Sequence, residues 1–144
     1  SFIMKNILFL VVSIILISCS SQDDFINKTD AKLERITALA ILQNLEQTLN
    51  ESRPEFKIKF ESSKVIKLDE VYYLRAVSGD YVSTTLLKKD ENGYLHSQGL
   101  TCTSKDCAHN DGCLPKPDGK SCTKCKVVLS DCTKTVSQAH FPPE

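Results

Sequence analysis

Residues 71–87 read VYYLRAVSGDYVSTTLL. Two runs rich in Val, Tyr and Thr, 71–77 and 81–87, lie on either side of the link Ser78-Gly79-Asp80. β-Branched and aromatic residues favour strands, and a short link that contains Gly favours an antiparallel hairpin. This stretch therefore predicts the centre of an antiparallel sheet.

Shorter runs on both sides of this stretch extend the predicted sheet. Residues 56–60, FKIKF, alternate apolar and polar side chains, which is the period of a half-buried strand. After residue 87, Asn92-Gly93 is a hairpin signal, because both residue types adopt positive φ at low cost. We therefore predict a meander of short strands at 56–60, 65–68, 71–77 and 81–87, with a fifth that could begin at 94–96.

A helix is expected before the strands, from about Asp30 to Glu51, with Thr29 or Asp30 as its N-cap. The residue before Pro54 is pushed out of helical conformation, so the helix should end there. Helical spacing places one apolar stripe on Ala38, Ile41, Leu42, Leu45 and Leu49, widened by Leu33, Ile36, Leu39 and Ala40. A stripe of this width is typical of a helix on a sheet. The sequence thus predicts an α+β fold, with one long N-terminal helix packed on a short antiparallel meander sheet.

The composition changes at Gly99, where apolar side chains become scarce. Such a segment buries too little apolar surface to offset its chain entropy unless something else holds it. It contains six cysteines, an even number: Cys102, Cys107, Cys113, Cys122, Cys125 and Cys132. We therefore predict a cysteine-rich C-terminal loop module held by three disulfides, for which 15 pairings are possible. Val127–Leu129 is expected to return to the sheet as a last strand, and 139–144 to form a frayed tail.

Two alternative uses of the cysteines stay open at this point. Cys122-x-x-Cys125 has the spacing that lets two sulfurs bind one tetrahedral metal ion, with His109 or His140 as a nitrogen ligand. The same pair could form a thiol-redox centre, because Lys124 lowers a thiolate pKa. A second C-x-x-C pair and the helix of a thioredoxin-like motif are both missing from the sequence, so disulfides are the preferred interpretation.

The N-terminus predicts export. A short basic start, Met4-Lys5-Asn6, precedes the apolar run 7–17, which is half the length of a spanning helix. We expect Met4 to be the true start. The run ends in Leu16-Ile17-Ser18-Cys19, which resembles the lipobox of bacterial lipoproteins. This resemblance implies cleavage before Cys19 and a diacylglyceryl group on the Cys19 sulfur.

Residues 21–25, SQDDF, are similar to the export signal of Bacteroidota-type surface lipoproteins. In that family, an acidic pair behind the lipidated cysteine directs the protein to the outer face of the outer membrane. The same residues also suit a solvated acidic tether. The resemblance implies location in the cell envelope and no activity.

The expected organisation is a lipoprotein signal peptide at 1–18, a lipidated tether at 19–28, an α+β domain at 29–98 and a cysteine-rich segment at 99–144. Charges balance at 18 basic and 18 acidic residues, so nucleic acid is not an expected partner. Phosphate-loop, nucleophile-elbow and paired-carboxylate motifs are absent from the sequence, and no catalytic residue, metal ligand or cofactor is assigned. We therefore expect a non-enzymatic binding or structural module, held on a membrane by lipid. Its partner would be an envelope protein or glycan, bound by the loop 104–120.

Overall fold

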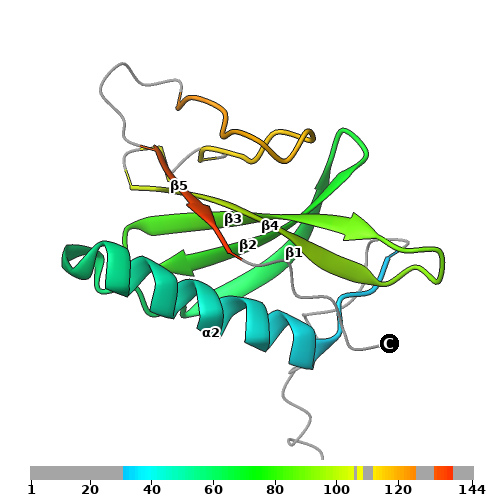
Figure 1. Cartoon of the computed structure of the whole chain (residues 1–144), viewed down its shortest axis with the longest axis horizontal. Coiled ribbons are helices and arrows are strands. Elements are labelled where there is room, and N and C mark those ends of the chain that lie inside the picture. Colours follow the sequence, from blue (N-terminus) through cyan, green and yellow to red (C-terminus); the bar gives the residue numbers. More distant parts are fainter. Residues whose placement is uncertain (1–30, 106, 109–111, 126–131, 138–144) are drawn as a thin grey trace, which may run out of the picture.

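The computed structural model describes residues 31–105, 107–108, 112–125 and 132–137. These residues form one helix, α2 (Arg35–Ser52), a 3-10 turn, η2 (Pro54–Phe56), and five strands. The strands are β1 (Ser62–Leu68), β2 (Val71–Ser78), β3 (Tyr81–Lys89), β4 (Leu95–Ser104) and β5 (Cys132–Val136). They pair antiparallel in chain order, β1-β2-β3-β4-β5 (Figure 1). The predicted combination of a helix with an antiparallel meander is confirmed.

α2 begins at Arg35, later than predicted, because the residues before it are extended. Lys32 pairs with the β3–β4 hairpin: its N–H donates to the Gly93 carbonyl, and the Leu95 N–H donates to the Lys32 carbonyl, both at 2.8 Å. The N-cap is Glu34 and not Thr29 or Asp30, which lie outside the described residues. Pro54 follows the end of α2 as predicted.

The buried stripe of α2 is narrower than the predicted one. Its buried members are Ala38, Ile41, Leu45 and Leu49. Ile36 and Leu39, which were expected to widen the stripe, are 81% and 48% exposed. Leu33, in the extended segment before α2, does pack against the core.

The strand predicted at 56–60 is wrong. Phe56 ends η2, and Lys57 has φ 49, which breaks an extended run. Side chains of α2 satisfy the backbone that follows. The Asn50 side chain accepts from the Ile58 N–H at 2.7 Å and donates to the Ile58 carbonyl at 2.8 Å, so no partner strand is needed at this residue. The alternation had a different cause: Ile58 is buried under α2, whereas Lys57 is exposed.

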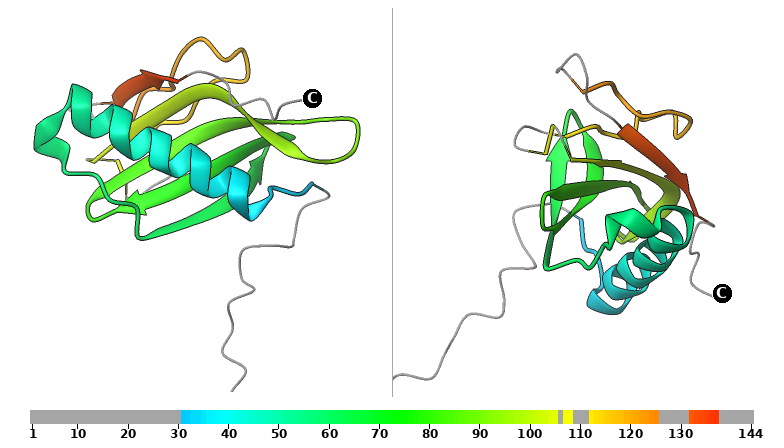
Figure 2. Two further views of the ribbon diagram at one scale, coloured as in Figure 1. Left: turned by 60° about the horizontal axis from the view of Figure 1, so that its bottom comes forward. Right: turned by 90° about the vertical axis from the view of Figure 1, so that its left-hand side faces the viewer.

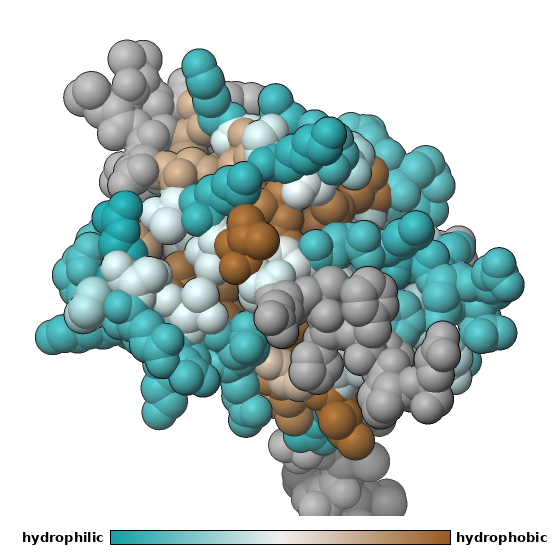
Figure 3. Space-filling model, viewed as in Figure 1, coloured by the Kyte–Doolittle hydropathy of each residue, from teal (hydrophilic) through white to brown (hydrophobic). Residues whose placement is uncertain are grey.

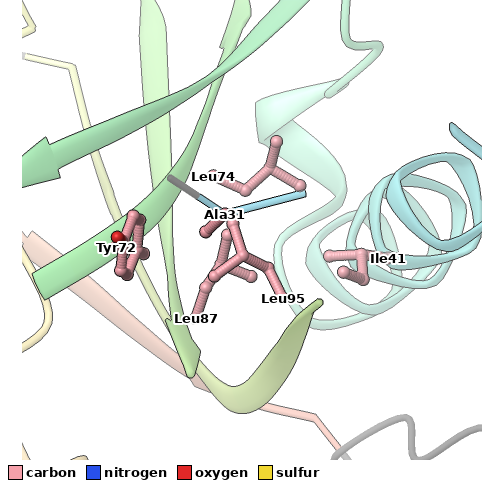
Figure 4. Close-up of a cluster of buried hydrophobic side chains, with 6 residues drawn as sticks. All are labelled: Ala31, Ile41, Tyr72, Leu74, Leu87 and Leu95. Atoms are coloured by element: carbon pink, nitrogen blue, oxygen red, sulfur yellow. The ribbon is translucent and has the colours of Figure 1, made fainter. Parts of the chain in front are cut away.

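The two faces of the sheet are distinguished by register. Tyr72 and Leu87 are opposite each other on β2 and β3, and both belong to a buried cluster with Ile41 of α2 (Figure 4). This is the helix face. Tyr73 and Leu86, which are opposite each other one position along, therefore point to the other face. We call that second face the outer face.

β4 passes through the composition change at Gly99 and ends only at Ser104. Its pairing with β3 is irregular, since Thr85 lies opposite Thr101 and Leu87 opposite Ser97. Gly99, with φ 77, lies within this irregularity. The first residues of the cysteine-rich segment, including Cys102, thus belong to the sheet. The last described strand is Cys132–Val136, and the strand predicted at Val127–Leu129 lies outside the described residues, as does the tail 139–144.

Candidate functional site: a disulfide-linked loop layer

The loop segment 112–125 lies against the outer face of the sheet, opposite α2 (Figure 2). The buried Tyr73 hydroxyl donates to the Pro115 carbonyl at 3.2 Å. A Cβ atom at Gly119 would lie 3.9 Å from Cδ2 of Leu86. The sheet is therefore covered by a helix on one face and by loops on the other.

We call the segment 112–125 the loop layer. Three disulfides hold it: Cys102–Cys122, Cys107–Cys125 and Cys113–Cys132. The three cysteines between residues 102 and 113 therefore bond to the three between residues 122 and 132, in the same order along the chain. The bridged Cα atoms lie 5.9, 5.8 and 6.1 Å apart. Because Cys102 is on β4 and Cys132 on β5, two of the bridges tie the loops directly to the sheet.

The loop layer also satisfies its own backbone. Across residues 114–123, the Thr123 N–H donates to the Leu114 carbonyl at 2.7 Å, and the Leu114 N–H donates to the Thr123 hydroxyl at 2.8 Å. The turn is closed by the Gly119 N–H, which donates to the Lys116 carbonyl at 2.9 Å. Residues 116–120 are exposed at its tip, and we call them the 116–120 turn. Bridges and hydrogen bonds together order this exposed turn.

The C-x-x-C pair is split between two bridges, because Cys122 binds Cys102 whereas Cys125 binds Cys107. The alternative in which Cys122 and Cys125 share a redox bond is therefore not what the structure contains. The sulfurs that do gather are those of Cys102, Cys122 and Cys132, whose Sγ atoms all lie within 4.8 Å of one another. The other proposed metal ligands, His109 and His140, lie outside the described residues.

Burial shapes the chemistry of the tyrosine that anchors the loops. Loss of solvent raises the pKa of Tyr73 above its ordinary value, and the charge of Asp69 raises it further. The phenol, which must be protonated to donate to Pro115, therefore stays protonated to a higher pH than an exposed tyrosine would.

A second polar group closes the β3–β4 hairpin at Asp90. One carboxylate oxygen accepts from the N–H groups of Asn92 and Tyr94 at 2.9 and 2.8 Å, and the other lies 2.8 Å from Nε2 of His96. The hydrogen bond from His96 is the main reason that the pKa of Asp90 is lowered, followed by that from Tyr94. The Asn92-Gly93 signal thus located the hairpin, but it missed the carboxylate that closes it.

The described part of the chain contains a small cavity and a few exposed hydrophobic side chains. A cavity between α2 and the sheet, lined by Asn44, Ser97 and Thr101 among others, measures ≈ 10 Å³, which is about the room that one water needs. On the face seen in Figure 3, hydrophobic side chains form separate patches among hydrophilic ones. Among the described residues, the large hydrophobic side chains that are exposed are Ile36 and Leu39 on α2, Leu68 on β1, Tyr94 just before β4 and Val136 on β5.

Cys19, the predicted lipidation site, lies outside the described residues. Among the residues that are described, no helix is both long and apolar enough to cross a membrane. No protein-family model, curated protein or solved structure matches the chain. The fold and the three bridges define a small disulfide-linked module of one helix on an antiparallel sheet.

Proposed function

We propose that this chain is a lipid-anchored, non-enzymatic module of the bacterial cell envelope that presents its disulfide-linked loops to an envelope protein or glycan. The observation that carries the proposal is the set of three bridges that fix the loop layer to the outer face. Disulfides persist in oxidising compartments outside the cytosol. They therefore agree with export directed by residues 1–18 and with a lipid on Cys19.

Rigid loops favour recognition, because the entropy of ordering them is lost on folding and not on binding. The exposed 116–120 turn is the part of the loop layer that a partner would meet first. It carries two lysines, an aspartate and a proline, so its contacts would be polar and shape-dependent. A partner bound through this turn leaves the helix face of the molecule free.

The lipid anchor is tested with Cys19→Ala. The unaltered protein should partition into the detergent phase on phase separation and carry the mass of the acyl groups, and the variant should do neither. Cys107→Ser is the matched control, because it removes a cysteine from the loop layer and should keep the lipid. An unaltered protein that lacks acyl mass would show that the lipobox resemblance is accidental.

The binding surface is tested by charge reversal. Lys116→Glu with Lys120→Glu alters the turn, and Lys57→Glu with Lys59→Glu alters two exposed lysines beside α2. Cross-linking on intact cells should yield a defined adduct with an envelope component in the unaltered protein and in the second pair, but not in the first. Retention of the adduct by the first pair would mean that the turn does not bind, and would favour a purely structural spacer.

A further inference from the structure

The two bridges Cys102–Cys122 and Cys113–Cys132 lie side by side at the junction of the sheet and the loop layer. The Sγ atoms of Cys102 and Cys122, from the first bridge, and of Cys132, from the second, are all within 4.8 Å of one another. The sulfur of Cys113 is bonded to that of Cys132, so a fourth sulfur is next to the group. The third bridge, Cys107–Cys125, has no member in it.

This spacing is close to that of a tetrahedral thiolate site. Zinc–sulfur bonds are about 2.3 Å long, which places two sulfurs of such a site about 3.8 Å apart. Four sulfurs reach that separation only once the bridges are opened and the side chains rotate. Cys102 on β4 and Cys132 on β5 are also positioned by the antiparallel pairing of these two strands.

Two buried hydroxyl groups flank the sulfurs. Within the part of the chain that the structure describes, the hydroxyls of Thr84 and Ser104 are buried and have no hydrogen-bond partner. Thr84 lies directly opposite Cys102 in the β3–β4 register, and Ser104 lies directly opposite Cys132 in the β4–β5 register. Side chains opposite each other on one face are neighbours. A disulfide gives such a hydroxyl little to bond, whereas a metal-bound thiolate is a good acceptor.

We propose that reduction converts these two bridges into a site for one Zn²⁺ ion, with Cys102, Cys113, Cys122 and Cys132 as ligands. The hydroxyls of Thr84 and Ser104 are positioning groups that donate to the thiolates. This site requires neither the lipid anchor nor a binding partner, so its success or failure is separate from that of the function proposed above.

The conversion balances with a dithiol as the reductant. Each bridge takes up two electrons and two protons, and each dithiol leaves as its own disulfide. Two bridges therefore yield four thiols for two dithiols consumed. The four thiols then bind Zn²⁺ as thiolates and release four protons to solvent, which makes the affinity increase with pH.

The test is a Co²⁺ titration of the reduced chain, freed of dithiol under anaerobic conditions. Cys19→Ala is present in every protein, so that the seventh cysteine cannot contribute a thiolate. We expect the charge-transfer and ligand-field absorption of tetrahedral thiolate-bound Co²⁺, saturation at one ion per chain and displacement of Co²⁺ by Zn²⁺. A chain without these bands overturns the proposal.

Paired cysteine variants locate the site. Cys107→Ser with Cys125→Ser removes the distant bridge and should keep the bands and the stoichiometry. Cys102→Ser with Cys122→Ser removes two ligands and should lose the bands. Far-UV circular dichroism of both variants checks that the sheet is folded. Bands that survive in the second variant, or that vanish in the first while its sheet stays folded, overturn the assignment of ligands.

The role of the hydroxyls is tested without touching a cysteine. Thr84→Val should weaken Zn²⁺ affinity by about 10- to 100-fold, as loss of groups that bond to metal ligands commonly does. Thr85→Val is the matched control, since its hydroxyl bonds to that of Thr101 on the helix face. Equal affinities in the two variants would show that the Thr84 hydroxyl does not act on the site.

Discussion

At the scale of single residues, Asn50 fixes the chain that links α2 to the sheet. Its side chain bonds to both the N–H and the carbonyl of Ile58, at 2.7 and 2.8 Å. Asn50→Ala leaves both groups without their partner, and each unsatisfied buried group costs about 1–3 kcal/mol. We expect a loss of about 2 kcal/mol in the free energy of unfolding, measured by urea denaturation.

The control for this prediction is Gln47→Ala on the same helix. Gln47 is exposed and bonds to Glu51 one turn away, a kind of contact that contributes about 0.5 kcal/mol or less. Equal losses in the two variants would mean that the effect of Asn50 is one of helix propensity and not of its bonds to Ile58.

Asp90 gives the molecule a predictable response to acid. Hydrogen bonds from His96 and from the Tyr94 N–H hold its pKa below the ordinary value of 3.8. A carboxyl group with a lowered folded-state pKa stabilises the fold above its unfolded pKa, and this contribution is lost as pH falls through the folded value. The unfolding free energy of the unaltered protein should thus decline below about pH 4 more steeply than that of Asp90→Asn. Parallel decline in urea titrations from pH 5 to pH 2 would contradict this.

At the scale of elements, the β1–β2 hairpin contains avoidable strain. Its turn residues Asp69 and Glu70 have φ 46 and 64, in the left-handed region that favours Asn and Gly. Asp69→Asn with Glu70→Gly should raise the free energy of unfolding by about 1 kcal/mol, even though the exposed ion pair of Glu70 with Lys67 is lost. Thermal denaturation measures the change.

The β2–β3 hairpin provides the control, in which a glycine with positive φ is replaced by alanine. Gly79 has φ 53, and a Cβ atom there would meet nothing within 4 Å. Gly79→Ala therefore isolates the cost of positive φ from any clash, and it should destabilise by about 1 kcal/mol. If neither hairpin responds, the turns relax and backbone strain does not decide their stability.

The elements that sequence predicted well are those set by local pattern. The runs 71–77 and 81–87 became β2 and β3 because β-branched and aromatic residues with Gly links specify hairpins locally. The run 56–60 misled because alternation reports burial of every second side chain, and a segment beside a helix can show it too. Nothing near Ile58 in the sequence reveals that Asn50 satisfies its backbone. The late start of α2 likewise depends on a distant pairing, between Lys32 and Tyr94.

At the scale of the whole molecule, the cysteine count predicted the number of bridges but not their pairing. Pairing depends on where β4 and β5 place Cys102 and Cys132, and on how the loop layer packs on the outer face. The fifth strand was expected to begin at 94–96, and β4 does begin there, at Leu95, but its continuation to Ser104 was not predicted. No pattern in the sequence predicts that extension, so Cys102 could not be placed in the sheet. The adjacent sulfurs and the buried hydroxyls are consequences of the same register, so they were equally hidden.

Because the loop layer and α2 cover opposite faces of the sheet, we predict that reduction in the absence of metal destabilises the loop layer more than it destabilises the packing of α2. Three bridges each contribute about 2–4 kcal/mol, so the urea midpoint should fall. Release of the loops should expose buried outer-face residues such as Tyr73 and Leu86, which is measured by binding of a dye specific for apolar surface. The helix signal should persist at low urea, because α2 packs on the opposite face through Ile41, Leu45 and Leu49. A variant with all six cysteines of the C-terminal segment replaced by serine should behave like the reduced protein, and its stability should not change when a reductant is added. Loss of the helix signal in step with dye binding would show that the two faces fold as one unit.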